Sequence, residues 1–210
     1  MMQQQLLNQL KTGDLVFFSS KGLGSSLIRV GTFSPWSHVG MVLQLANYDF
    51  VTLWEAVPSR DGFCLYAQRA SKGVQVVALE ERVAQHQGDV AVRQLMGEEL
   101  NQAALDNLMQ LLEQLQGRRY EQDFWQLTRA GWDGPWGGNS QDLSSLFCSE
   151  LVAAAYQRLG LLDETKPANE YTPADFSEDA LRELNFGFYL SEEVELLKQE
   201  PSIGEFSFSV

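Results

Sequence analysis

The spacing of the apolar residues changes near Gly97, and this change limits the fold more than any other feature of the sequence. Before Gly97, short runs of β-forming residues are separated by polar turns, with no long helical pattern among them. After Gly97, apolar residues recur at the 3.6-residue period of a helix, up to Gly117. They are Leu100, Ala104, Leu108, Leu111, Leu112 and Leu115. Short strands followed by helices predict an α+β fold, with a small antiparallel sheet or barrel packed against helices.

The β-rich half predicts about five strands. Their expected ranges are 14–19, 38–45, 51–57, 74–79 and 90–95, with a turn over 47–49. A short helix over 25–30 is expected between the first two strands.

The second half predicts helices separated by a glycine-rich loop. The amphipathic pattern predicts a long helix over 97–117, and 118–130 is expected to continue as another. Residues 131–142 hold four glycines and a proline, which predicts a loop. A strong helix is then expected over 145–159, with Ser145 as its N-cap and Gly160 just beyond its end.

The last part of the chain has weaker signals. Thr172 and Pro173 have the pattern of a cap and a first helical residue, so another helix is expected over 171–184. A strand over 186–190 is the one element expected in the tail.

Composition limits the classes of partner. A length of 210 residues with 44% apolar residues fits one domain over 1–210. The chain has 15 basic and 28 acidic residues, and the net charge of -13 disfavours nucleic acid and anionic membranes as partners. The first ten residues lack a signal-peptide pattern, and no run of 18 apolar residues follows. We therefore expect a cytoplasmic protein without stable membrane insertion.

The two cysteines and two histidines favour thiol chemistry over disulfide or metal chemistry. Cys64 and Cys148 cannot form a disulfide framework, and neither has the spacing of a metal site with the two histidines. No metal and no cofactor are expected. Cys64 lies between Phe63 and Leu65, away from any predicted helix start, and is expected to pack in the core.

Cys148 is the candidate nucleophile. It follows Ser145 by three residues, so it falls in the first turn of the helix if Ser145 is the N-cap. Free N–H groups at a helix start favour a thiolate, and they stabilise the oxyanion that forms when a thiolate attacks a carbonyl. The alternative is a small buried side chain that packs against the sheet.

His38 and Glu55 are the candidate partners of this thiol. His38 begins a predicted strand after a Pro-Trp-Ser loop, where its imidazole can face a groove. A histidine within reach of a cysteine makes the ion pair of a thiol nucleophile. Glu55 lies on the next predicted strand and could hold the imidazole in one tautomer. The alternatives are a half-buried strand histidine and a solvated strand glutamate.

Other polar and aromatic residues are weaker candidates. His86 is flanked by polar residues and is expected at the surface. Three aromatic residues lie in or before the glycine-rich loop: Tyr120, Trp132 and Trp136. They either line the base of a substrate groove or cover the core. We retain Tyr120 as a candidate substrate-binding residue.

Several short motifs resemble the NlpC-type cysteine peptidase superfamily, which has a papain-like fold, and specifically its circularly permuted, YiiX-like branch. Unpermuted members have the cysteine helix before the histidine strand, whereas this chain has the order His38, Glu55, Cys148. The matching motifs are 13–17 (GDLVF), 37–42 (SHVGMV), 54–57 (WEAV) with 73–74 (GV), 147–152 (FCSELV) with Tyr156 and Gly160, and 172–176 (TPADF).

The resemblance implies a single domain with a five- to six-stranded antiparallel sheet packed against helices. It also implies a Cys-His-Glu triad of Cys148, His38 and Glu55. Members of the family resemble amidases that cut peptide bonds in cell-wall muropeptides. Related permuted proteins resemble the lecithin:retinol acyltransferase group. The stretch from Tyr120 to Phe124 is loosely similar to a tyrosine-aspartate segment of the family.

Three functions fit these observations. The first is a thiol hydrolase that cleaves an amide bond in a small peptide. The second is an acyltransferase or lipid thioesterase that uses the same triad on an acyl substrate. The third is a binding module that keeps the fold without catalysis. A polar groove beside Cys148 would favour peptides, a long apolar tunnel would favour lipids, and a misaligned pair would favour the binding module.

Overall fold

The computed structural model describes residues 2–19, 34–115, 140–178 and 180–198. Within these residues, six strands form one antiparallel sheet in the order β4, β3, β2, β1, β5, β8. Their bounds are β1 (Leu15–Phe18), β2 (His38–Leu43), β3 (Thr52–Cys64), β4 (Arg69–Ala78), β5 (Val90–Arg93) and β8 (Val194–Leu197). A separate short pair is formed by β6 (Leu95–Met96) and β7 (Tyr189–Leu190). The expected α+β class is therefore confirmed.

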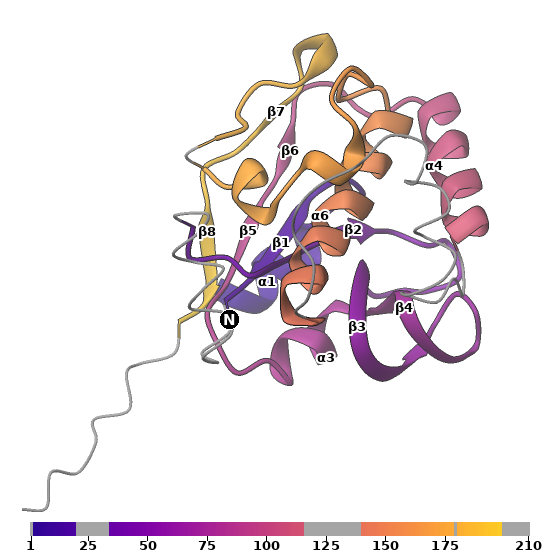
Figure 1. Ribbon diagram of the computed structural model, residues 1–210, viewed down its shortest axis with the longest axis vertical. Coiled ribbons are helices and arrows are strands. Elements are labelled where there is room, and N and C mark those ends of the chain that lie inside the picture. Colours follow the sequence, from indigo (N-terminus) through magenta and orange to yellow (C-terminus); the bar gives the residue numbers. More distant parts are fainter. Residues whose placement is uncertain (1, 20–33, 116–139, 179, 199–210) are drawn as a thin grey trace, which may run out of the picture.

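Helices cover both faces of the sheet (Figure 1). The α-helices are α1 (Met2–Gln9), α3 (Leu79–Ala84), α4 (Gln102–Leu115) and α6 (Ser140–Arg158). Short 3-10 turns follow α6: η1 (Ala168–Glu170), η2 (Pro173–Phe176) and η3 (Asn185–Gly187). Figure 1 shows α6 crossing one face of the sheet with α4 beside it. Among the described residues, no helix combines the length and apolar character needed to cross a lipid bilayer.

The sheet has an apolar core on each face because successive strand residues point to opposite sides. On the α6 face, Phe17 and Trp54 pack with residues of α4 and α6. On the other face, Phe18 and Leu53 pack with Leu79 of α3 and with Leu7 of α1. Burial on both faces explains why β1 and β2 are nearly continuous apolar runs.

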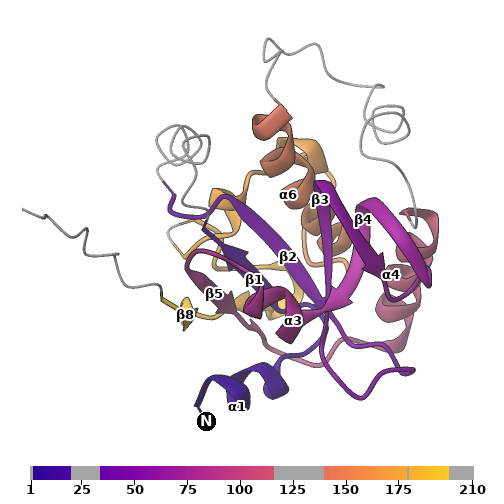
Figure 2. The ribbon, with the colours of Figure 1, turned by 90° about the horizontal axis from the view of Figure 1, so that it is seen from below.

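Strands β2 and β3 separate at one end. Their pairing runs from Leu43 with Thr52 to Met41 with Trp54. His38 and Glu55 lie beyond the last of these pairs. Figure 2 shows the two strands diverging from their paired end toward the side where α6 lies.

The strand predictions are confirmed, with changes at their ends. The two strands expected over 51–57 and 74–79 extend into the long β3–β4 hairpin. The strand expected over 90–95 is divided, because β5 ends at Arg93 and Leu95 pairs with Leu190 instead. The elements α1, α3 and β8 were not expected from the sequence. The segments 25–30 and 118–130 lie outside the described residues.

The prediction that the helix holding Cys148 starts after Ser145 is wrong. Helix α6 begins at Ser140, so Ser145 is not its N-cap and the last three residues of the predicted loop are helical. No glycine or proline occurs from Asn139 to Leu159, and a helix can therefore extend back toward the glycines at 137 and 138. The expected end is correct, since Gly160 follows the helix with a φ of 77°.

The prediction of a helix over 171–184 is also wrong beyond the first turn. Thr172 and Asp175 form the capping box of the 3-10 turn η2, and Pro173 is its first residue. The chain then leaves helical geometry. The carbonyl oxygens of Phe176 and Ser177 accept hydrogen bonds from the Arg93 guanidinium. The Ser177 carbonyl also accepts a bond from the Ala180 amide, three residues on, which is the spacing of a 3-10 turn and not of an α-helix. The strand expected over 186–190 is reduced to Tyr189–Leu190.

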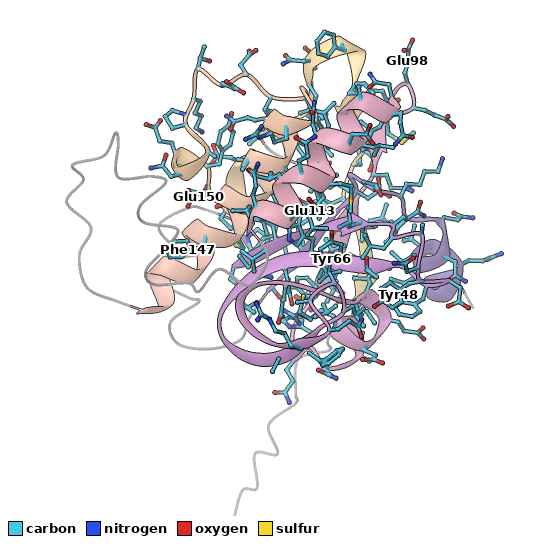
Figure 3. All side chains as sticks on the ribbon, turned by 90° about the vertical axis from the view of Figure 1, so that its right-hand side faces the viewer. Tyr48, Tyr66, Glu98, Glu113, Phe147 and Glu150 are labelled. Atoms are coloured by element: carbon cyan, nitrogen blue, oxygen red, sulfur yellow. The ribbon has the colours of Figure 1, made fainter. Side chains whose placement is uncertain are left out.

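The β3–β4 hairpin meets α4 at the side of the molecule (Figure 3). The Tyr66 hydroxyl donates a hydrogen bond to Glu113 of α4 at 3.5 Å. In the same view Phe147 and Glu150 mark the α6 side of this helix pair. The contact links the far end of the hairpin to the helical layer.

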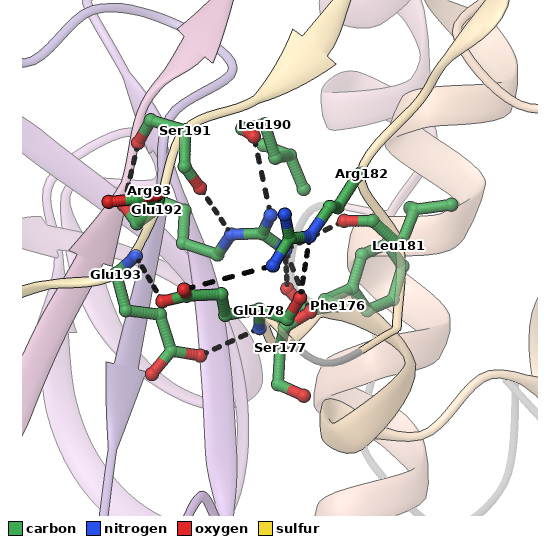
Figure 4. Close-up of polar contacts among 10 residues, drawn as sticks. All are labelled: Arg93, Phe176, Ser177, Glu178, Leu181, Arg182, Leu190, Ser191, Glu192 and Glu193. Atoms are coloured by element: carbon green, nitrogen blue, oxygen red, sulfur yellow. Dashed lines mark hydrogen bonds and ion pairs between the residues drawn. The ribbon is translucent and has the colours of Figure 1, made fainter.

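Arg93 joins the C-terminal segment to the sheet (Figure 4). Its side chain is 1% exposed, at the end of β5. Its guanidinium donates to backbone carbonyl oxygens of later residues at 2.7 to 3.3 Å. The acceptors are Phe176, Ser177, Leu181, Leu190 and Ser191. A buried cation is tolerated here because its N–H groups are satisfied by hydrogen bonds.

Candidate functional site

Three elements bring the sequence-predicted site residues together. His38 is the first residue of β2 and pairs with Phe18 of β1. Glu55 lies on β3, and Cys148 comes from α6. His38 and Glu55 lie beyond the last pair of β2 and β3.

His38 is in contact with both other residues. Its Nε2 donates a hydrogen bond to Glu55 Oε2 at 2.8 Å. Its side chain also shares a hydrogen bond with Cys148. Because Nε2 faces Glu55, Nδ1 is the ring nitrogen left for the sulfur. The His38 side chain is 12% exposed, so the imidazole lies just below the surface.

The surroundings of His38 favour its charged form. Burial opposes the charge, but the charge and hydrogen bond of Cys148, followed by those of Glu55, raise the pKa of His38 from 6.5 to about 9. The imidazolium is therefore the main form at neutral pH. A cysteine beside an imidazolium has the arrangement of a thiol nucleophile.

Glu55 is held by two residues that sequence reasoning missed. It is 0% exposed, and Gln75 of β4 donates to its Oε1 at 3.0 Å. Arg82 of α3 donates from Nε to both carboxylate oxygens at 3.1 Å. Burial opposes ionisation, but the hydrogen bond from His38 and the charge of Arg82 lower the pKa of Glu55 from 4.5 to about 2. Glu55 is therefore an ionised carboxylate.

Phe18 packs against the charged residues of the site. Its ring centroid lies 5.6 Å from that of His38 and 4.2 Å from the guanidinium carbon of Arg82. His86 also packs on Phe18, at 5.1 Å, and donates from Nε2 to the Ser19 carbonyl at 2.7 Å. The expected surface position of His86 is therefore wrong. Its ring is half-buried because an apolar partner comes from β1, far away in sequence.

The position of Cys148 in its helix differs from the expectation. Since α6 begins at Ser140, Cys148 lies about two turns inside the helix. A backbone N–H at an interior position is bonded within the helix, so the predicted role of a free helix start in activating the thiol is wrong. Cys148 is 0% exposed. Its side chain shares a hydrogen bond with that of His38.

The remaining candidates have different outcomes. Cys64 packs in the core as expected, and its sulfur accepts a hydrogen bond from the Val76 amide at 3.3 Å. Tyr120, Trp132 and Trp136 lie outside the described residues. Glu150, two residues after Cys148, is 6% exposed, and burial raises its pKa to about 8. In the described part of the chain, no group of three or more His, Cys, Asp and Glu residues is arranged to hold a metal ion.

The sequence pattern of one protein family matches residues 9–182. That family is described as permuted papain-like amidase enzymes, YaeF/YiiX, the C92 family. The chain belongs to this family. The expected resemblance to permuted, YiiX-like papain-fold proteins is confirmed. Membership in the C92 family makes the chain an enzyme of the cysteine peptidase and amidase type.

One solved structure similar to this C92 family chain is that of YiiX from Escherichia coli O157:H7, described as a metalloprotein. The two chains are 22% identical, with a TM-score of 0.49. The similarity covers 92% of this chain and 99% of YiiX. No curated protein matches the chain.

Proposed function

We propose that this enzyme is a thiol hydrolase that cleaves an amide bond in a small peptide, with Cys148 as nucleophile, His38 as acid and base, and Glu55 as the residue that orients His38. The observation that carries the proposal is the unbroken series of contacts from Cys148 through His38 to the buried Glu55. Membership in a family of amidases supports the reaction class.

The first half of the reaction forms an acyl-enzyme. The Cys148 sulfur attacks the amide carbonyl carbon, and a C–S bond forms. The His38 imidazolium then gives its proton to the amide nitrogen, the C–N bond breaks, and the amine leaves. Glu55 accepts the Nε2–H bond throughout, so the reacting proton lies on Nδ1.

The second half returns the enzyme to its starting state. Neutral His38 takes a proton from water through Nδ1, and the water oxygen attacks the thioester carbon. The C–S bond breaks, and the carboxylic acid leaves. Transfer to another acceptor in place of water would use the same residues, so the products identify the reaction.

The substrate class can be tested by product analysis. The enzyme is incubated with a mixture of cell-wall muropeptides and, separately, with acyl esters and phospholipids, and the products are identified by mass spectrometry. The Cys148→Ala variant is the control. We expect muropeptides to gain one water at a peptide bond only with the unchanged enzyme. If only the lipid substrates were turned over, the proposed amidase activity would be rejected in favour of acyl transfer.

A further inference from the structure

Arg82 lies behind Glu55, on the side away from Cys148 in the series of contacts. It belongs to α3, and its side chain is 10% exposed. Its Nε is 3.1 Å from both oxygens of Glu55, and its guanidinium carbon is 4.2 Å from the centre of the Phe18 ring. The two contacts fix the guanidinium from two directions.

Glu55 needs a cation at every stage of the proposed reaction. It is 0% exposed, and a buried carboxylate without a counter-charge takes up a proton. His38 supplies a positive charge before the reaction. It loses that charge when it protonates the leaving amine, and it is neutral in the acyl-enzyme. Arginine stays protonated at all working pH values.

We propose that Arg82 is a positioning residue that keeps Glu55 ionised while His38 is neutral, and so preserves His38 as the base of the deacylation step. This inference rests on the proposed thiol hydrolase function. An ionised Glu55 keeps the His38 proton on Nε2 and leaves Nδ1 free to accept a proton from water. A proton taken up by the His38–Glu55 pair would have to leave before His38 could act as a base.

The two residues of this pair and the groups bonded to them come from five elements. His38 is on β2, Glu55 and Gln75 are on β3 and β4, and Arg82 is on α3. Cys148 reaches the pair from α6 through His38. His86 follows α3 in the chain, contacts the Phe18 ring at a centroid distance of 5.1 Å, and donates to the Ser19 carbonyl. Among the charged side chains that the structure describes as bonded to Glu55, Arg82 is the one whose charge does not change.

The test separates acylation from deacylation with p-nitrophenyl acetate as the probe. Acylation forms a C–S bond on Cys148 and releases p-nitrophenolate as a burst, whereas deacylation releases acetate by attack of water. The Arg82→Gln variant should keep a burst rate within about threefold of the unchanged enzyme, because His38 is charged at that stage. Its deacylation should slow by about tenfold or more at pH 6. The acetyl-enzyme should then accumulate, as seen by intact-protein mass spectrometry.

The pH dependence distinguishes this role from a general loss of structure. In the Arg82→Gln variant, deacylation should recover between pH 6 and 9, because the extra proton leaves the His38–Glu55 pair. In the unchanged enzyme, and in the Arg82→Lys variant, which keeps the charge, deacylation should reach its full rate at a lower pH than in Arg82→Gln. Arg182→Gln is the matched control, since the Arg182 side chain is 65% exposed and pairs with Glu178. It should behave as the unchanged enzyme.

The kinetics of the Arg82 variants and of the unchanged enzyme decide whether Arg82 has this role. A folded Arg82→Gln variant that deacylates at the normal rate, or whose burst and deacylation slow equally at all pH values, overturns the role of Arg82. Should this variant not fold, the Arg82→Lys variant decides: a deacylation pH profile like that of the unchanged enzyme supports the role, and a larger loss at low pH overturns it. Absence of a Cys148-dependent burst in the unchanged enzyme would instead reject the thiol hydrolase function itself.

Discussion

Nε2 of His38 lies 2.8 Å from Oε2 of Glu55, although the two residues are on strands that are not paired at this point. This contact leads to the first prediction. Glu55→Gln should keep the fold and lose activity by about 10²-fold, because an amide oxygen still accepts the Nε2–H bond but carries no charge. Cys148→Ala should lose more than about 10³-fold. Steady-state kinetics on a cleaved peptide compares them. Equal losses would give Glu55 a direct chemical role.

The two cysteines should differ in reactivity. Both are buried, but Cys148 contacts a charged histidine, whereas Cys64 contacts the Val76 amide. Iodoacetamide at neutral pH should therefore modify Cys148 well before Cys64, as peptide mass mapping would show. The His38→Ala variant should remove this preference. Faster labelling of Cys64 would indicate that the wrong sulfur has been chosen.

The charge on His38 should depend on Cys148. NMR of the two labelled histidines should give His38 a pKa of about 9 in the unchanged enzyme. In Cys148→Ala this pKa should fall, because the largest favourable influence is removed. The raised pKa stabilises the folded state fully below 6.5, and this contribution is lost as the pH rises through about 9. An unchanged His38 pKa in the variant would contradict the contact.

Arg93 should matter for stability and not for chemistry. Arg93→Met removes the guanidinium donor from five backbone carbonyl oxygens, three of them in buried contacts, so the free energy of unfolding should fall by about 3 kcal/mol or more. Urea denaturation measures this loss. The exposed control Arg182→Gln should change stability by less than about 0.5 kcal/mol. Equal stability of the two variants would show that the carbonyl contacts contribute little.

The parts of the site that carry local signals could be predicted from the sequence. His38 stands at the start of one apolar run and Glu55 lies within the next, so each is predicted to lie on a strand. Cys148 lies in a segment with helical spacing of apolar residues, so it is predicted to lie on a helix. Gly160 and the Thr172–Asp175 capping box have equally local signals, and both are found in the structure.

The missed features depend on contacts between distant segments. Gln75 reaches Glu55 because the β3–β4 register places the two opposite each other. Arg82 belongs to a helix of six residues, too short to show a period. The start of α6 was misplaced because several serines before Cys148 are all acceptable N-caps, and local preference does not choose among them.

The carbonyl groups that surround Arg93 also bear on how the protein is made. They lie 83 to 98 residues after Arg93 in the chain. While the ribosome is still adding these residues, the guanidinium of Arg93 has none of its final acceptors and stays hydrated. The edge of β5 that receives β8 is also empty until Val194–Leu197 have been added. The sheet that presents His38 therefore reaches its final form only after the chain has been made as far as Leu197.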